Sequence, residues 1–369
     1  MTSLPKILVI GSPIGLIPED LWASFSSRYD VLLYDFPTTH SFHEGLQNGP
    51  CSDIVAIVRL GLNIPAGAAK VGQGWTKAAL PFLPSSLEAI VNFGHGYDEE
   101  DILGLDARGI RFFNTTGGTQ ATATIGIYLI IAAFRQVSRY ERMLRNGDFL
   151  PALRDSAKHA VDPHGKSVAI IGMGSIGQAV ARLAAALGMR LHCVKRPSLQ
   201  HLIDVSKNEH QCGGSLPILT LHDDINSLVA TVDCVVLSCS YTPSTHHLVD
   251  KELLERMKPG VRIVNIARGK CIDEGALCYA IENGKVGGVG LDVHYNEYVS
   301  LFGPAHKSRP GVCNTADAIY EFNTTRLANI TSKTPSQPKA TLIRLRHSSA
   351  SHWWTHQRNH EHSRRPERR

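Results

Sequence analysis

The chain has 369 residues, 43% of them hydrophobic, which is enough for two domains with full-sized cores. Its formal net charge of +5 arises in residues 333–369, where nine Lys or Arg stand against two Glu, so the remainder is close to neutral and gives no reason to expect a nucleic-acid or membrane partner. No apolar run approaches the roughly 20 residues of a membrane span, and the chain opens without a signal-peptide pattern, so we expect a cytoplasmic protein. The eight cysteines form no CxxC pair, and we expect them to be reduced. We expect no metal site.

The first 120 residues alternate strand-like runs with turns and helical stretches. The runs are apolar and rich in β-branched residues, and they lie at residues 7–10, 31–34, 54–58, 89–93 and 110–114. This alternation is typical of an α/β layer with its own core. We therefore predict a first domain over residues 1–120.

A long helix is predicted next. Between residues 121 and 145 apolar side chains recur at helical spacing, at Ile125, Leu129, Ala132, Ala133 and Val137. About six turns of continuous helix are long enough to connect two domains. The second domain is therefore expected from residue 121 onward.

A glycine-rich turn follows this helix. It stands between an apolar run at residues 168–171 and an Ala-rich helical pattern at residues 179–187, and a second strand is expected at residues 190–194. Such a turn lets the backbone approach a pyrophosphate, which binds at the helix N-terminus. The sequence therefore predicts a βαβ unit that binds a dinucleotide. The residues of the turn are Gly172, Gly174, Ser175, Ile176 and Gly177.

The end of the strand at residues 190–194 indicates which dinucleotide is preferred. In NAD-binding units an Asp or Glu about 20 residues beyond the first glycine accepts hydrogen bonds from the ribose hydroxyls. This chain carries Lys195 and Arg196 in that zone instead. Because such cations attract a 2′-phosphate, we predict NADP(H) as the preferred cofactor, with NAD(H) as the alternative. The competing interpretation makes both cations ordinary solvated loop residues.

Three further strands are predicted in the second domain. Residues 233–239, 261–267 and 286–293 are continuous apolar runs, as expected of strands buried on both faces of a parallel sheet. Ligands of such sheets bind beyond the carboxyl ends of the strands. The residues that follow each run are therefore the candidates for a functional site.

The segments at these strand ends resemble a known family. Residues 237–245, 265–269 and 291–297, together with the glycine turn and residues 92–98, closely resemble the D-2-hydroxyacid dehydrogenases, and look like the fungal members related to glyoxylate and hydroxypyruvate reductases. The resemblance covers roughly residues 50–297 and again, weakly, residues 316–330. It implies an α/β fold of two Rossmann-like or flavodoxin-like domains with parallel sheets, the cofactor domain inserted into the substrate domain, and a homodimer built through the cofactor domain.

The expected domain divisions follow from this resemblance. Residues 1–120 are the first part of the substrate domain, residues 121–314 the NAD(P)-binding domain, and residues 315–332 a truncated helix that returns to the substrate domain. The remainder, residues 333–369, has no sustained helical or strand period, and we expect it to be disordered. A misread or alternatively spliced C-terminus is favoured over a tail that binds anionic partners.

The resemblance also implies catalytic roles. Arg268 would bind the carboxylate and carbonyl oxygen of a 2-oxo acid and polarise the carbonyl for hydride attack. Glu297 matches the acid that hydrogen-bonds a catalytic histidine and raises the pKa of that histidine. Asp292 would lie by the nicotinamide. The competing interpretations are a structural salt bridge for Arg268, a surface charge for Glu297 and a cap for Asp292.

The same match assigns further residues to each ligand. The residues expected along the cofactor, besides Asp292, are Ser240, Thr242, Ile266 and Ala267. Those expected around the substrate, besides Arg268, are Phe93, Gly94, His95 and Gly96. Gly94 and Gly96 match backbone amides that hold the substrate carboxylate. His95 is interpreted as a loop residue near the substrate and not as the catalytic acid.

The expected proton donor is missing. The family places its histidine roughly 20 residues beyond the acid, but residues 311–320 contain none. His306 is the nearest substitute, nine residues beyond Glu297, and His294 is expected to take part in ordinary packing. Two functions therefore stay open. One is NAD(P)H-dependent reduction of a small 2-oxo acid such as glyoxylate or hydroxypyruvate to the D-2-hydroxy acid, impaired if the histidine is lost. The other is a catalytically silent, dinucleotide-binding regulatory or scaffold protein.

Overall fold

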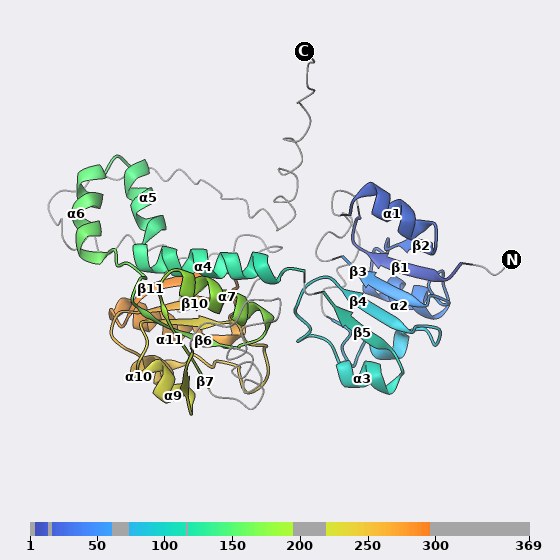
Figure 1. The fold of residues 1–369 in the computed structure, drawn as a ribbon. Coiled ribbons are helices and arrows are strands. Elements are labelled where there is room, and N and C mark those ends of the chain that lie inside the picture. The colour runs from blue at the N-terminus through green and yellow to red at the C-terminus, as the bar shows by residue number, and fades with distance from the viewer. Residues whose placement is uncertain (1–3, 14–16, 61–73, 116, 195–218, 296–369) are drawn as a thin grey trace, which may run out of the picture. The chain divides into compact units, whose positions relative to one another are not determined.

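The computed structural model describes residues 4–13, 17–60, 74–115, 117–194 and 219–295. These residues form two compact units divided after Thr115, called here the first and second units. Each is an α/β layer built on a parallel sheet (Figure 1). The predicted fold class is therefore confirmed. The segments 315–332 and 333–369 lie outside the described residues.

The described part of the first unit has a five-stranded parallel sheet in the order β2-β1-β3-β4-β5. The strands are β1 (Lys6–Ile10), β2 (Asp30–Leu33), β3 (Ala56–Arg59), β4 (Ala89–Asn92) and β5 (Arg111–Asn114). The helices are α1 (Glu19–Ser26), α2 (Thr39–Gln47), α3 (Ile102–Ala107) and the 3₁₀ helix η1 (Leu80–Phe82). All five strands fall where the apolar runs predict them, and their order is that of flavodoxin-like sheets.

The central strands of the first unit carry its core. Leu8, Ile57 and Ile90 pair in register across β1, β3 and β4, and all three are fully buried. Phe42 of α2 and Trp75 pack into the same cluster. This packing fixes the sheet, and with it the loops that leave the carboxyl ends of its strands.

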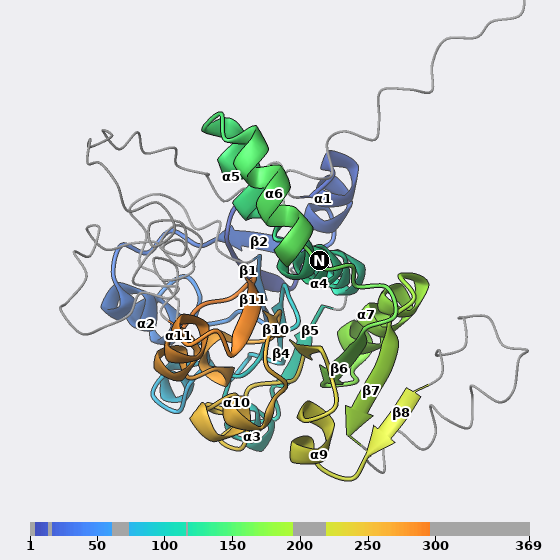
Figure 2. The same ribbon diagram turned by 90° about the vertical axis from the view of Figure 1, so that its left-hand side faces the viewer.

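The described part of the second unit has a six-stranded parallel sheet in the order β11-β10-β9-β6-β7-β8. The strands are β6 (Ser167–Ile171), β7 (Arg190–Val194), β8 (Leu219–His222), β9 (Cys234–Leu237), β10 (Val261–Asn265) and β11 (Val286–Leu291). Figure 2 shows β6, β7 and β8 following one another toward one edge. The strand order reverses between β6 and β9, as in the Rossmann fold, where dinucleotides bind at that reversal. The sequence pattern did not predict β8.

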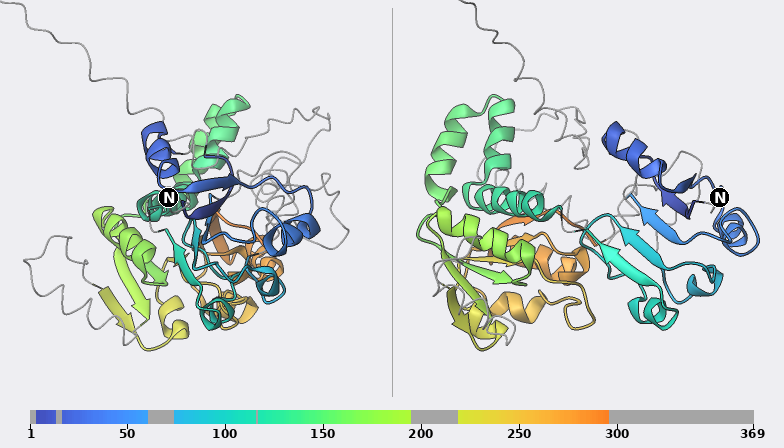
Figure 3. Two further views of the ribbon diagram at one scale, coloured as in Figure 1. Left: turned by 90° about the vertical axis from the view of Figure 1, so that its right-hand side faces the viewer. Right: turned by 45° about the vertical axis from the view of Figure 1, so that its right-hand side comes forward.

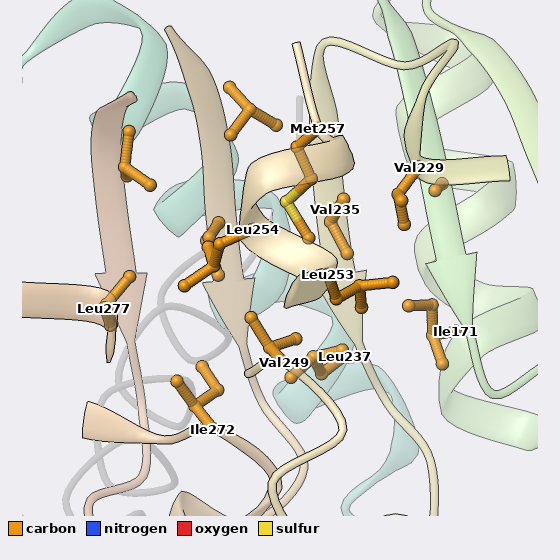
Figure 4. Close-up of a cluster of buried hydrophobic side chains, with 14 of the residues drawn as sticks. Ile171, Val229, Val235, Leu237, Val249, Leu253, Leu254, Met257, Ile272 and Leu277 are labelled. Carbon is orange, nitrogen blue, oxygen red and sulfur yellow. The ribbon is translucent and has the colours of Figure 1, made fainter. Parts of the chain in front are cut away.

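Helices cover both faces of this sheet. The helices α4 (Thr119–Arg135) and α7 (Ser175–Ala186) share one buried cluster with the sheet, and α9 (Ile225–Val229), α10 (Lys251–Arg256) and α11 (Glu274–Glu282) share the other. Figure 4 shows side chains of α10 lying over β9 in the second cluster. Along β6, Val168 and Ile170 belong to one cluster and Ala169 and Ile171 to the other, because successive strand side chains point to opposite faces.

The strand β11 is glycine-rich where α4 crosses it. A Cβ atom at Gly290 would lie 2.7 Å from the Cβ atom of Leu129, and one at Gly288 would overlap the backbone of Ala133. The two glycines therefore let α4 lie directly on the strand. This contact seats the helix that begins the second unit against its sheet.

The single long helix predicted over residues 121–145 is wrong. Gln136 has left-handed backbone angles (φ 52°, ψ 41°) that end α4, and the chain bends by 66° into α5 (Val137–Arg145). Next comes α6 (Phe149–His159), which is joined to α5 by an Arg139–Asp155 ion pair at 2.9 Å. Figure 3 shows α5 and α6 standing away from the sheet. Within the described ranges no single helix has the length and apolarity to cross a membrane, although α4 and α5 taken together reach both.

The cysteines only partly follow the expectation of reduced, buried residues. Cys51, Cys193, Cys234 and Cys271 are buried free thiols, and Cys239 is a half-buried one. Cys278 is disulfide-bonded, which the sequence did not predict. In the part of the chain that the structure describes, no group of three or more His, Cys, Asp or Glu side chains is placed to hold a metal ion.

Candidate functional site

The glycine turn follows β6 at the carboxyl edge of the second sheet. Gly172 has a φ of 105°, a backbone conformation that other residues rarely adopt, and a Cβ atom on it would lie 2.5 Å from the backbone N of Cys239. A Cβ atom on Gly177 would overlap the carbonyl oxygen of Gly172. The fold of the turn therefore requires glycine at both positions.

The turn leads into the N-terminus of α7. Gly174 is the N-cap residue and provides no side chain to cap the helix, while a Cβ atom on it would meet no other atom within 4 Å. Ser175 is exposed and Ile176 is half-buried in the first turn. An uncapped N-terminus with open space before it binds anions, because its N–H groups and the helix dipole face outward. This arrangement fits the pyrophosphate of a dinucleotide.

The end of β9 lies against the glycine turn. Ser238 donates its hydroxyl to the carbonyl oxygen of Gly172 at 2.7 Å, and its amide donates to the carbonyl oxygen of Ile171 at 2.9 Å. The sequence did not single out Ser238, although a polar residue directly after a strand next to the turn was a usable signal. Ser240 and Thr242 are exposed in the loop that continues from it.

Arg268 lies three residues beyond the end of β10. It is half-buried, and its Nη1 donates to the carbonyl oxygen of Ala267 at 2.7 Å. The Asn265 side chain donates to the carbonyl oxygen of Arg268 at 2.9 Å and accepts from the amide of Ala267 at 3.0 Å. Asn265 is only 1% exposed. It therefore fixes the backbone that carries Arg268, a role that the sequence did not predict.

Of the residues near Arg268 that were predicted to line the cofactor, two are buried and one is exposed. Ile266 and Ala267 are buried, the first in the cluster under α4 and α7 and the second in the cluster on the opposite face. Asp292 is exposed after β11, and its amide donates to the carbonyl oxygen of Asn265 at 3.0 Å. A Cβ atom on Gly269 would overlap the backbone of His294. The segment after β11 therefore runs alongside the turn that carries Arg268.

The glycine turn and Arg268 share one edge of one sheet. Ile171, Leu237 and Asn265 are paired across β6, β9 and β10, so β9 is the single strand between the two features. Adjacent strands lie about 4.8 Å apart, so the two strand ends are separated by about 10 Å. That distance suits a ligand that reaches from the dinucleotide turn to the guanidinium.

Four residues named from the sequence lie outside the described residues. They are Lys195, Arg196, Glu297 and His306. The described strand β7 ends at Val194, so Lys195 and Arg196 follow it directly in the chain.

The predicted substrate loop belongs to the first unit, where it follows β4. Phe93 is 68% exposed and Gly94 has a φ of 110°. The amide of Gly94 donates to the Thr115 hydroxyl at 2.8 Å, and the carbonyl oxygen of His95 accepts from the Asn114 side chain at 3.0 Å. The end of β5 therefore holds this loop, and the amide of Gly94 is engaged within the protein. Gly96 is half-buried in the same loop.

A buried carboxylate anchors the other side of this loop. The Glu100 side chain, 3% exposed, pairs with Arg59 at 3.3 Å and accepts from the Asn92 side chain at 2.9 Å. Removing one member of such a buried pair leaves a charge without compensation. Glu100 therefore connects the ends of β3 and β4, and the sequence did not identify it.

Comparison with known proteins assigns the chain to a family. Residues 127–317 match the model of the NAD-binding domain of D-isomer specific 2-hydroxyacid dehydrogenases. The chain belongs to the D-2-hydroxyacid dehydrogenase family. It is therefore an oxidoreductase with a domain for a nicotinamide dinucleotide, as the strand-end motifs predict.

Relatives of this family member resemble it over most of its length. It is 31% identical to the 4-methyl-2-oxopentanoate reductase A of Aspergillus oryzae over 80% of this chain and 83% of that protein. It is 35% identical to a glyoxylate reductase of Pyrococcus horikoshii over 57% of this chain and 62% of the relative. The holo form of the D-mandelate dehydrogenase of Rhodotorula graminis has a TM-score of 0.71 at 29% identity, over 89% of this chain and 94% of the other.

Proposed function

We propose that this family member reduces a small 2-oxo acid of the glyoxylate or hydroxypyruvate type to the D-2-hydroxy acid, with NADPH as the preferred reductant. The observation that carries the proposal is the shared edge, where the Gly172 turn and Arg268 flank the end of β9. The names of relatives support the reaction class, since they are reductases of glyoxylate and 4-methyl-2-oxopentanoate.

The cofactor would be held by the residues around the turn. The N-terminus of α7 and the uncovered face of Gly174 would take the pyrophosphate, and Ser238 keeps the turn closed against β9. When bound, the nicotinamide supplies the hydride. Asp292, exposed beside the turn of Arg268, would orient the nicotinamide carboxamide by accepting a hydrogen bond.

Arg268 would bind and activate the substrate. Its guanidinium is planar and offers paired N–H donors, so it holds a carboxylate and polarises the neighbouring carbonyl oxygen. Charge develops on that oxygen as hydride arrives at the carbon, and a positioned cation stabilises it. The two hydrogen bonds of Asn265 keep the Arg268 backbone in place for this task.

The proton that completes the reduction needs a donor. Glu297 would support a histidine, and His306 is the nearest histidine that follows it in the sequence. If neither delivers the proton, the rate falls by a factor on the order of 10² to 10⁴. The proposed enzyme would then be slow, with binding intact.

The cofactor preference would be set directly after β7. Lys195 and Arg196 stand where NAD-binding units carry an acid, so they would bind the 2′-phosphate of NADPH. NAD(H) is the alternative cofactor and would lack this interaction.

A second copy of the chain would cover α5 and α6. Leu144, Phe149, Leu150 and Leu153 are each more than half exposed on these two helices. Clustered apolar side chains on a surface mark an interaction site. A homodimer through the second unit buries them, and sedimentation velocity that finds only monomer at micromolar concentration would refute it.

The competing function is a silent dinucleotide-binding protein that regulates or scaffolds a partner. One observation favours it, namely the absence of histidine from residues 311–320. The two functions predict the same cofactor binding and differ only in turnover.

One experiment separates them. NADPH binding is titrated by fluorescence, and NADPH oxidation is followed with glyoxylate, hydroxypyruvate and 4-methyl-2-oxopentanoate as substrates. We expect binding together with turnover of at least one acid. Binding without turnover of any of the three favours the silent protein.

A further inference from the structure

Two cysteines lie close to the carboxyl edge of the second sheet, next to the glycine turn and Arg268. Cys239 follows β9 by two residues, and Cys271 ends the 3₁₀ helix η2 (Gly269–Cys271), which follows Arg268 directly. Cys239 packs against the buried cluster that contains Cys271, and a hydrogen bond from the Cys239 thiol is the main influence that lowers the pKa of Cys271. Both are free thiols, and they come from loops that leave neighbouring strands.

The two thiols differ in exposure. Cys271 is fully buried among the side chains under α10 and α11, whereas Cys239 is half-buried at the border of that cluster. A small oxidant therefore reaches Cys239 first. Cys271 lies deeper in the same cluster.

The surroundings of Cys271 favour its thiolate. The hydrogen bond with Cys239 is the largest influence that lowers the pKa of Cys271, and the backbone of Arg268, the Thr245 hydroxyl and the Arg268 charge act in the same direction against burial. Elsewhere burial raises thiol pKa values, to about 11 for Cys193 and about 12 for Cys234. A lowered pKa favours the thiolate of Cys271, which can accept the proton of the Cys239 thiol, whereas burial keeps Cys193 and Cys234 protonated.

We propose that Cys239 and Cys271 form a reversible disulfide that switches off the proposed reductase when hydroperoxide is present. The Cys239 thiol passes its proton to the Cys271 sulfur, and the resulting Cys239 thiolate attacks the terminal oxygen of the hydroperoxide. The O–O bond breaks, and the leaving oxygen takes up a proton from solvent to give water or an alcohol. Cys271 then attacks the sulfenic sulfur, and the hydroxyl group leaves as water. Two thiols are oxidised and one hydroperoxide is reduced.

Closing this disulfide disturbs the site from two sides. The sulfur atoms must approach from hydrogen-bonding separation to about 2.05 Å. Cys239 cannot give way freely, because its backbone lies directly against Gly172. Cys271 is tied to Arg268 through its amide, which donates to the Arg268 carbonyl oxygen at 3.0 Å. The strain therefore falls on the glycine turn and on the backbone of Arg268.

The loss of turnover rests on the proposed function, whereas disulfide formation does not. The full chain is treated with hydrogen peroxide, and peptide mapping with fragmentation locates disulfides. We expect a Cys239–Cys271 link, weaker NADPH binding, and turnover reduced by about 10²-fold, the scale of a 1 Å misplacement of catalytic groups. Dithiothreitol restores the untreated state.

Variants separate this pair from other cysteines. Each variant is compared with its own untreated sample. Cys239→Ser and Cys271→Ser should keep their cofactor affinity and turnover after peroxide, while Cys193→Ala, which removes a buried thiol of the same sheet, should lose them as the parent does. The proposal is overturned if the link does not form, or if it forms without changing cofactor affinity. If the parent has no turnover at all, disulfide formation and the NADPH affinity measured by titration still test the proposal.

Discussion

Asn265 holds the backbone of Arg268 through its side-chain amide, which donates to the carbonyl oxygen of Arg268 at 2.9 Å. The same side chain accepts from the amide of Ala267 at 3.0 Å, and the carbonyl oxygen of Asn265 accepts from Asp292. One buried residue thus sets the turn after β10 and joins it to the end of β11. The position of the guanidinium depends on this residue as much as on Arg268 itself.

Replacing Asn265 with Ala should therefore damage both stability and catalysis. The buried amide of Ala267 and the partly buried carbonyl oxygen of Arg268 lose their partner, so we expect the free energy of unfolding to fall by about 1–3 kcal/mol. The kcat/KM for the 2-oxo acid should fall as well, because Arg268 is no longer fixed. Urea unfolding and steady-state kinetics measure the two effects. Asn283→Ala, which removes an exposed amide at the end of α11, should change neither. Unchanged kcat/KM in the Asn265 variant would remove the positioning role.

The first two glycines of the turn should respond differently to alanine. Gly172→Ala places a Cβ atom at a φ of 105° and against Cys239, so we expect a loss of about 1–3 kcal/mol in the free energy of unfolding. Gly174→Ala meets open space, so stability should hold while NADPH binding weakens by about tenfold or more. Thermal unfolding and fluorescence titration measure these quantities. Equal cofactor affinity in the Gly174 variant and the parent would contradict the placement of the pyrophosphate.

The cofactor preference is testable at two positions after β7. Replacing both Lys195 and Arg196 with Ala should raise the Kd for NADPH about 10- to 100-fold, the scale of hydrogen bonds to a charged group. The Kd for NADH should change little, since NADH has no 2′-phosphate. An equal loss of affinity for NADPH and NADH would mean that Lys195 and Arg196 support the fold and do not set the cofactor preference.

The stability of the second unit should depend on pH through His192. Its Nδ1 lies 2.9 Å from Nε2 of His222. Burial, followed by His222, Arg190 and Lys258, lowers the pKa of His192 below 6.5, and Asp233 opposes them. The folded state therefore binds this proton less readily than the unfolded state, and stability is lost as the pH falls from 6.5 through the folded pKa.

Urea unfolding between about pH 5 and pH 7.5 measures this dependence. The parent should gain stability with rising pH, and His192→Gln should show a flatter profile. His40→Gln, an exposed residue of the first unit, should keep the slope of the parent. An unchanged slope in the His192 variant would contradict the assignment.

Much of the fold followed from the sequence because its strands are buried on both faces. Apolar runs predicted β1 to β7 and β9 to β11, and the glycine turn located the start of α7. The edge strand β8 (Leu219–His222) was not predicted, because its residues are half-exposed or exposed and form no continuous apolar run. The bend at Gln136 was not predicted, because the helical spacing of apolar residues continues across it. The left-handed residue there is a glutamine, and no glycine signals a helix end.

Residue type and position after a strand were enough to nominate Arg268 and the turn glycines, whose roles stay predictions. The same signals did not nominate residues that support another group through contacts. Asn265 and Glu100 were not nominated, because their roles depend on which carbonyls, amides and cations the fold brings to them. Such contacts join residues of different loops, and local sequence does not encode them.

The central claim is that Arg268 activates a 2-oxo acid at the edge that binds the dinucleotide. The most direct measurement compares glyoxylate-dependent NADPH oxidation in the parent, Arg268→Ala, Arg268→Lys and Arg256→Ala, beside NADPH titrations. Arg256 is an exposed residue of α10 and serves as the control. The account predicts a loss of about 10²- to 10³-fold in kcat/KM for Arg268→Ala, partial activity for Arg268→Lys, and unchanged cofactor binding throughout. An Arg268→Ala protein that oxidises NADPH as fast as the parent would contradict it.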